Sequence, residues 1–107
     1  MEDCIFCQIA NHQVPNEFMY EDEDIVVFPD IHPLRPTHLL IVPKKHFTDF
    51  LSLDSELLWN KIRETAQNMV RQFDLEETGF RLSLNGGGAQ QINHLHLHLM
   101  GPMGKAV

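Results

Sequence analysis

Apolar and polar residues alternate strictly near the end of the chain, which reads His94-Leu95-His96-Leu97-His98-Leu99-Met100. This period of two predicts a β-strand, because successive side chains of a strand point to opposite faces. On a helix, each two-residue step turns the side chain by about 200°, so the three histidines could not share a face. We therefore expect the three leucines to enter a core while the three imidazoles face the other way.

Two segments have the apolar spacing of helices. Residues 3–10 predict a short helix with Asp3 as its N-cap. Asp54 to Phe73 predicts one long helix, for which Ser52 or Asp54 supplies the cap. Its apolar stripe, which we expect in the core, comprises Leu57, Leu58, Ile62, Ala66, Met69, Val70 and Phe73.

Four other segments are predicted as strands because they are β-branched or alternate in polarity. They are residues 17–20, 25–28, 38–42 and 80–84. Residues 21–24 predict a solvated acidic turn. Hairpin-like strands combined with one long helix and one short helix predict an α+β fold with an antiparallel sheet.

Composition limits the possible function classes. The 107 residues predict one domain spanning 1–107, and a hydrophobic content of 43% is ordinary for a soluble protein. The sequence holds no run of about 20 apolar residues and no charged-then-apolar leader, so we expect a cytoplasmic protein without a membrane partner. The net charge of −7 disfavours general binding to nucleic acid, so local groups must hold any phosphate ligand.

Three imidazoles in a row on one strand suit an anionic substrate better than a single metal ion. Neighbouring residues on one face are about 6.6 Å apart, too far for all three to reach one metal at about 2.0–2.1 Å. Imidazole, with a free pKa of about 6.5, can act as nucleophile, acid or hydrogen-bond donor. The row therefore favours phosphate chemistry, and the alternative is a half-buried strand whose polar face happens to be histidine.

Two further motifs carry candidate chemistry. The loop Asn85-Gly86-Gly87-Gly88-Ala89-Gln90-Gln91 offers backbone N–H groups and amide side chains, which suit a phosphate cradle; an ordinary turn is the alternative. Cys4 and Cys7 are the only cysteines and form half of a zinc site. Packed thiols, or a redox pair, are the alternatives for these cysteines.

At these residues the chain resembles the histidine triad (HIT) nucleotide-binding family, whose signature is His-φ-His-φ-His-φ-φ, where φ is apolar. The similarity is greatest to the Hint branch, the nucleoside phosphoramidases, and it extends beyond the triad. The other matching segments are Asp3-Cys4-Ile5-Phe6-Cys7, Phe28-Pro29-Asp30-Ile31, Pro36-Thr37-His38, Val42-Pro43-Lys44-Lys45-His46 and Asn85. The resemblance implies a HIT-like sheet of about five strands and a homodimer that joins two sheets across a dyad.

The resemblance also implies catalytic roles. His96 attacks the α-phosphorus of a purine nucleoside 5′-phosphoramidate and becomes a transient nucleotidyl-histidine, which water hydrolyses. His98 contacts the phosphate and helps to protonate the leaving group. His94 and His38 join the same hydrogen-bonded network, although His38 by itself also fits a satisfied strand histidine. The reaction requires no metal ion.

Binding roles follow from the same resemblance. Asp30 corresponds to the acid that binds the ribose hydroxyls, and Asn85 and Gln90 correspond to residues that hold the phosphate. The family usually has a hydroxyl where this chain has Gln91, which leaves the leaving-group preference open. The apolar slot for an AMP-like base comprises Ile5, Phe6, Ile9, Phe28 and Ile31, which from the residues alone would be core.

A structural zinc ion is a further implication, because bacterial relatives with this arrangement of cysteines complete the site with histidines. Here those ligands would be Cys4, Cys7, His46 and His94. Two rival functions stay open: a dinucleoside polyphosphate hydrolase that also uses His96, and a non-catalytic nucleotide-binding or zinc-dependent interaction module. A DNA-repair deadenylase is disfavoured by the acidic charge balance.

Overall fold

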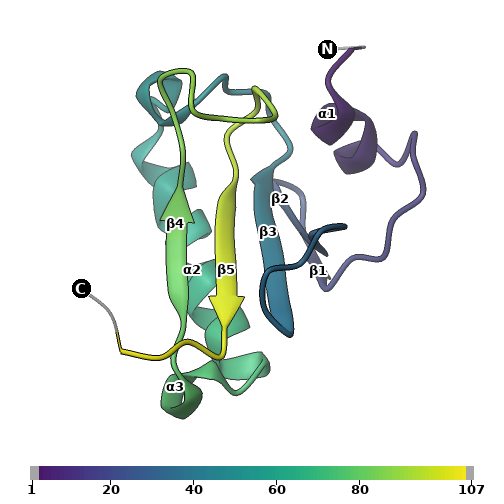
Figure 1. Ribbon diagram of the computed structural model, residues 1–107. Coiled ribbons are helices and arrows are strands. Elements are labelled where there is room, and N and C mark those ends of the chain that lie inside the picture. Colours follow the sequence, from purple (N-terminus) through teal and green to yellow (C-terminus); the bar gives the residue numbers. More distant parts are fainter. Residues whose placement is uncertain (1–2, 106–107) are drawn as a thin grey trace.

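The computed structural model describes residues 3–105, and it contains one five-stranded antiparallel sheet with strand order β1-β2-β3-β5-β4 (Figure 1). The predicted α+β fold is therefore confirmed. The elements are α1 Ile5–Ala10, β1 Tyr20–Glu21, β2 Ile25–Pro29, β3 Thr37–Pro43, the 3₁₀ turn η1 Phe50–Ser52, α2 Glu56–Gln72, α3 Leu75–Thr78, β4 Arg81–Leu84 and β5 Leu97–Gly101. Among the described residues, no helix has the length and apolar character needed to cross a bilayer.

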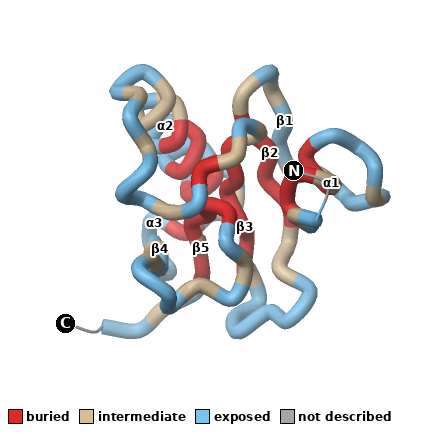
Figure 2. Tube along the Cα trace, turned by 90° about the horizontal axis from the view of Figure 1, so that it is seen from above, coloured by how far each residue is buried: buried red, intermediate tan, exposed pale blue. Residues whose placement is uncertain are grey.

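The sheet separates two apolar clusters, so the buried residues lie on both of its faces (Figure 2). On one face, α2 packs against Ile25 and Val27 of β2 and Leu97 and Leu99 of β5. On the other face, α1 packs against the alternate residues of β2 and β3, such as Phe28. The period of two along each strand thus sends side chains to the two layers in turn.

The same alternation places the histidines. Leu95, Leu97 and Leu99 all belong to the cluster under α2, as the pattern predicts. His98 therefore faces the α1 side, opposite Leu40 in the β3–β5 ladder. Since β5 pairs with β3 on one side and β4 on the other, it is an interior strand of the sheet.

Strand β5 begins at Leu97, so the prediction of a continuous strand from His94 is wrong for the first three residues. In this segment, backbone carbonyls accept hydrogen bonds from histidine ring nitrogens and not from the N–H groups of a neighbouring strand. The ring Nδ1 of His96 lies 2.7 Å from the carbonyl of His94, and the ring Nε2 of His94 lies 2.8 Å from the carbonyl of Pro43. Pro43 also lacks the N–H that could continue the pairing.

The predicted helix caps are wrong by one to three positions. Cys4, and not Asp3, caps α1, because its sulfur accepts the N–H of Cys7 at 3.4 Å. Ser55 caps α2 by accepting the N–H of Leu58 at 3.1 Å. Ser52 is unavailable for that role, since it forms a reciprocal capping box with Asp49 around η1.

Two shorter segments also differ from the expectation. The strand predicted at residues 17–20 is wrong for its first three residues, because β1 contains only Tyr20 of them together with Glu21 of the predicted acidic turn. The chain reverses at Asp22, whose Oδ1 accepts the backbone N–H groups of Asp24 and Ile25 at 2.7 and 2.8 Å. This local bonding by an aspartate side chain fixes where the hairpin turns.

The stripe of the long helix is buried at its centre. Ile62, Ala66, Met69 and Val70 lie in the core, whereas Leu57, which the spacing also predicted as core, is 71% exposed. Leu57 shares its helix face with Asn60 and Glu64, which are also exposed, so it lies on the solvent side of α2. The remaining stripe residues, Leu58 and Phe73, are partly buried and pack against the core.

Candidate active site and metal site

The ring of His96 has one defined tautomer. Its Nδ1 lies 2.7 Å from the carbonyl oxygen of His94, which can only accept, so Nδ1 carries the proton. The neutral ring therefore has an unprotonated Nε2 with a free lone pair. His96 is 5% exposed, and the ring of Phe6 packs edge-on against it with centroids 5.0 Å apart. This ring can act as a nucleophile without a separate base.

A second chain of hydrogen bonds defines His38 and His98. The backbone N–H of Leu34 donates to Nδ1 of His38 at 3.1 Å, so the proton of the neutral His38 ring is on Nε2. That Nε2–H lies 2.9 Å from Nδ1 of His98. His98 thus accepts at Nδ1 and presents its own Nε2–H as a donor. His96, with its bare nitrogen, and His98, with its donor, are adjacent, with ring centroids 5.0 Å apart.

The surroundings of His38 and His98 favour the neutral forms of these two rings at pH 7. Burial lowers the pKa of His38, against an opposing effect of the Asp30 carboxylate. Burial also lowers the pKa of His98, and the neighbouring His96 and His38 act in the same direction. Neutral rings keep the donor and acceptor assignments above, since a protonated imidazole would be a donor at both nitrogens.

Asp30 borders the pair, with its Oδ2 3.4 Å from Nε2 of His38 and 4.0 Å from Nδ1 of His98. These three groups are close enough to bind a metal ion. The amide of Leu34 argues against that role, because a ring that accepts at Nδ1 must keep its proton on Nε2 and has no lone pair to offer there. His38 and His98 therefore form a hydrogen-bonded pair beside the Asp30 carboxylate.

Cys4, Cys7, His46 and His94 converge from α1, from the segment after β3 and from the start of the triad, as expected for a metal site. Nδ1 of His94 lies 3.4 Å from the sulfur of Cys4 and 3.5 Å from that of Cys7. Nδ1 of His46 lies 3.3 Å from the Cys7 sulfur and 3.1 Å from Nδ1 of His94. A tetrahedral zinc site has ligand-to-ligand separations of about 3.3–3.8 Å, given its bond lengths of about 2.0–2.3 Å.

The protonation of the cluster also suits a metal. The Nε2–H of His94 donates to the carbonyl of Pro43, so the Nδ1 that faces the thiols has a free lone pair. Burial lowers the pKa of His94 to about 4, which keeps the ring neutral. Burial and the neighbouring Cys4 raise the pKa of the Cys7 thiol, an effect that a bound cation would reverse. The residues present therefore fit a zinc ion.

Solvent reaches the cluster through a cavity of about 390 Å³, lined by Cys4 and His46 and by Gln91 from the glycine-rich loop. His96 does not line this cavity. The segment before the triad thus borders the candidate metal cluster.

The predicted phosphate loop leads directly into that segment. Asn85 and Gln91 are exposed, and Gln90 is partly buried. The Nε2 of Gln90 is buried without a hydrogen-bond partner. A buried amide nitrogen without an acceptor costs free energy, so an external acceptor such as a phosphate oxygen would satisfy it.

The residues predicted to hold the base divide into two groups. Phe6, Ile9 and Phe28 are buried together in the cluster under α1, whereas Ile5 and Ile31 are exposed. Phe6 contacts Phe28 and His96 with its ring. Phe6 therefore joins the apolar group to the ring of His96, and the two exposed members are available to a ligand.

Sequence reasoning missed two backbone groups and one side chain at the site. The carbonyl of His94 and the N–H of Leu34 set the ring tautomers, and no sequence pattern identifies such groups. Asp49 holds the phosphate loop through the N–H of Gly87 at 3.0 Å. The sequence signal that could have identified Asp49 is its spacing from Ser52, which matches a capping box.

Comparisons with known proteins agree with this geometry. Residues 3–106 match the family described as "Scavenger mRNA decapping enzyme C-term binding". Protein HitA of Neisseria gonorrhoeae is 37% identical over 105 residues, covering 94% of this chain and 97% of the relative. The purine nucleoside phosphoramidase of Escherichia coli K12 is 32% identical over 109 residues, covering 96% and 92%.

A solved structure agrees equally well. The HIT family hydrolase from Clostridium thermocellum superposes with a TM-score of 0.90 at 33% identity, covering 100% of this chain and 98% of that one. With the triad, its sheet and these relatives in agreement, the chain belongs to the histidine triad family.

Proposed function

We propose that this protein hydrolyses purine nucleoside 5′-phosphoramidates through a covalent nucleotidyl intermediate on His96, as a member of the Hint branch. The observation that carries the proposal is the bond from Nδ1 of His96 to the His94 carbonyl, which leaves Nε2 free to attack. The similarity to a purine nucleoside phosphoramidase supports the choice of substrate class.

The reaction has two steps. In the first, Nε2 of His96 attacks the α-phosphorus, the phosphorus–nitrogen bond breaks, and the amine leaves with the electron pair and a proton delivered through His98. In the second, water attacks phosphorus, the bond between phosphorus and Nε2 of His96 breaks, the nucleoside monophosphate leaves, and a proton of the water returns to His98. His98 suits its role because its Nδ1 accepts from His38, which leaves Nε2–H as a donor.

Binding of the nucleotide is assigned to the groups around these rings. Asp30 binds the ribose hydroxyls, and Phe6, Ile9 and Phe28 form the apolar base of a slot that Ile5 and Ile31 border from the surface. Asn85, Gln90 and Gln91 bind the phosphate and the leaving group, and the buried unpartnered nitrogen of Gln90 supports this assignment.

Trapping the intermediate tests the proposal. The protein is mixed with adenosine 5′-monophosphoramidate, quenched rapidly and mapped by mass spectrometry, and we expect the adenylyl group on His96. His96→Ala should bind AMP but turn over no substrate. A label on another residue would overturn the assignment, and faster cleavage of diadenosine tetraphosphate would favour the polyphosphate hydrolase. Nucleotide binding without any turnover in the wild type would favour a sensor.

We also propose that Cys4, Cys7, His46 and His94 bind a structural zinc ion. When bound, the ion would link α1 to the start of the triad strand, and it supplies no chemistry to the reaction. Thiols that serve as ligands need a reducing compartment, which supports a cytoplasmic location.

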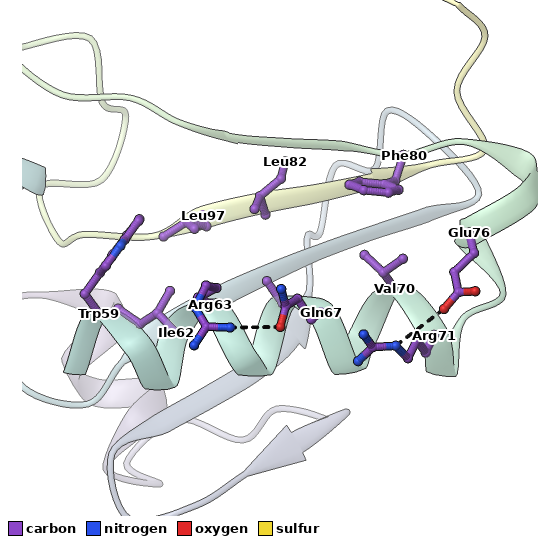
Figure 3. A pocket seen from close by; sticks show the side chains of 11 residues that line it. Trp59, Ile62, Arg63, Gln67, Val70, Arg71, Glu76, Phe80, Leu82 and Leu97 are labelled. Carbon is purple, nitrogen blue, oxygen red and sulfur yellow. Dashed lines mark hydrogen bonds and ion pairs between the residues drawn. The ribbon is translucent and has the colours of Figure 1, made fainter. Parts of the chain in front are cut away.

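A homodimer is the assembly that we propose. Strand β4 ends the sheet, and within residues 3–105 its outer edge has no partner strand. Phe80 and Leu82 are 48% and 43% exposed beside that edge. A hollow of about 340 Å³ between α2 and β4 adjoins it, lined by Trp59, Arg63 and Leu82 among others (Figure 3).

A second copy would continue the sheet across β4 and cover this apolar surface, since unpaired edges favour strand addition. Leu82→Asp should convert a dimer to a monomer in sedimentation experiments, whereas Leu51→Asp, at a residue that is 85% exposed elsewhere, should not. A wild type that sediments as a monomer would contradict the proposal.

A further inference from the structure

One carboxylate joins the phosphate loop to the rest of the protein. Oδ2 of Asp49 accepts the backbone N–H of Gly87 at 3.0 Å, while Oδ1 accepts that of Leu51 at 2.9 Å. The Asp49 side chain is fixed on its own turn, because Ser52 completes a capping box with it. A single side chain therefore links η1, which follows β3, to the loop between β4 and β5.

The loop depends on this support. Gly87 and Gly88 have φ values of +62° and +92°, a region that glycine adopts freely and other residues rarely do. A Cβ atom at either position would have no neighbour within 4 Å, so packing does not hold this part of the loop. Besides the Asp49 contact, the turn has one internal bond, from the N–H of Ala89 to the carbonyl of Gly86 at 3.1 Å.

The fit between the loop and Asp49 is close. A Cβ atom at Gly86 would lie 3.4 Å from Oδ2 of Asp49, which is the shortest distance of an ordinary van der Waals contact. Three residues beyond the tethered Gly87, the chain reaches Gln90, whose amide nitrogen is buried without an acceptor. The position of the tether thus decides where the phosphate-binding donors lie.

We propose that Asp49 is a positioning residue for phosphate recognition. By accepting the N–H of Gly87, it orders residues 85–90 before the ligand binds. Their hydrogen-bond donors can then contact the phosphate without an entropy cost for ordering the loop. This inference rests on the proposed function, because it assumes that the loop binds the phosphate of a nucleotide. Hydrogen bonds from Gly87 and Leu51 lower the pKa of Asp49, so the anchor is ionised at neutral pH.

Comparing AMP with adenosine isolates the phosphate contribution. We expect Asp49→Ala to weaken the binding of AMP about tenfold, the equivalent of one lost hydrogen bond to a charged group, and to leave the affinity for adenosine unchanged. In turnover, KM should rise with kcat nearly unchanged, since Asp49 does not touch the reacting atoms. Asp54→Ala, at an exposed aspartate close in sequence, is the matched control and should change neither affinity.

The outcomes separate this inference from the function on which it rests. A wild type that does not bind AMP would defeat the proposed function. A wild type that binds AMP, combined with an Asp49→Ala variant that binds it equally well, would overturn the role of Asp49. Equal weakening of AMP and adenosine would mean a general structural role and would overturn it too. If Asp49→Ala fails to fold, Asp49→Asn, which keeps one acceptor oxygen, should still lower the ratio of AMP to adenosine affinity.

Discussion

The carbonyl oxygen of His94 lies 2.7 Å from Nδ1 of His96, while the ring of the same His94 faces the thiols of Cys4 and Cys7. His94 therefore belongs to the candidate metal cluster through its side chain and orients His96, the proposed nucleophile, through its backbone. The candidate metal site and the proposed catalytic site are joined at this residue.

The tautomers can be observed directly. We expect nitrogen NMR of the ¹⁵N-labelled protein to show His96 protonated at Nδ1, where it donates to the carbonyl of His94. His38 and His98 should be protonated at Nε2, because Nδ1 of each ring accepts a hydrogen bond. Assignment by histidine-to-glutamine variants identifies each ring. A His96 ring protonated at Nε2 would remove the basis for its role as nucleophile.

The relay through His38 has a kinetic consequence. His38→Ala leaves Nδ1 of His98 without its donor, so the His98 ring loses its fixed tautomer. We expect kcat to fall by about 10²-fold, the lower range for a proton-transfer group, with a smaller change in KM. His32→Ala, at an exposed histidine of the loop that leads into β3, should keep full activity. Equal losses in the two variants would indicate a general disturbance of the loop.

Metal binding can be measured without reference to activity. Reduced protein should bind one Zn²⁺ per chain, and a ligand present at about 100 times its Kd raises the free energy of unfolding by about 2.7 kcal/mol. The melting temperature should fall when a chelator removes the metal. Cys7→Ser should lose the stoichiometric zinc, whereas His12→Ala, at a surface histidine, should retain it. Zinc bound equally by both variants would place the ion elsewhere.

The stability of the metal-free protein should depend on pH in one direction. Burial lowers the folded-state pKa values of His94, His38 and His98, that of His94 to about 4. Below pH 6.5 the unfolded chain binds more protons than the folded chain, so this contribution to stability is complete above pH 6.5 and is lost as pH falls toward 4. Urea unfolding at pH 7.5, 6 and 4.5 measures it. A constant free energy of unfolding over that range would show that these rings are accessible to protons.

The core under α2 should be sensitive to a single truncation. Leu99 is fully buried between β5 and α2, so Leu99→Ala leaves a cavity and should cost about 2–5 kcal/mol of unfolding free energy. Leu51→Ala removes the same atoms from a residue that is 85% exposed and should change stability by less than about 0.5 kcal/mol. Chemical denaturation of both variants provides the comparison.

Patterns that reflect local spacing predicted the fold well. The alternation of Leu95, Leu97 and Leu99 identified the buried face of the triad, and helical spacing identified α2 to within two residues at each end. These features are readable because one side of each element is apolar along its length. The two cysteines were also brought together with His46 and His94, as the resemblance implied.

Features that depend on partners distant in sequence were not readable. The start of β5 at Leu97 depends on bonds between ring nitrogens and the carbonyls of His94 and Pro43. The anchoring of Gly87 by Asp49 spans 38 positions, and no local pattern records a contact of that kind.

Strand β5 is flanked by β3 and β4 over the residues that carry His98, whereas residues 85–93 have no strand on either side. Amide protons on β5 should accordingly be among the last to exchange with deuterium, and those of the glycine turn among the first. The proposed proton donor, His98, therefore lies on the strand that should open most slowly, whereas the order of the proposed phosphate loop depends on a few hydrogen bonds, such as that from Gly87 to Asp49.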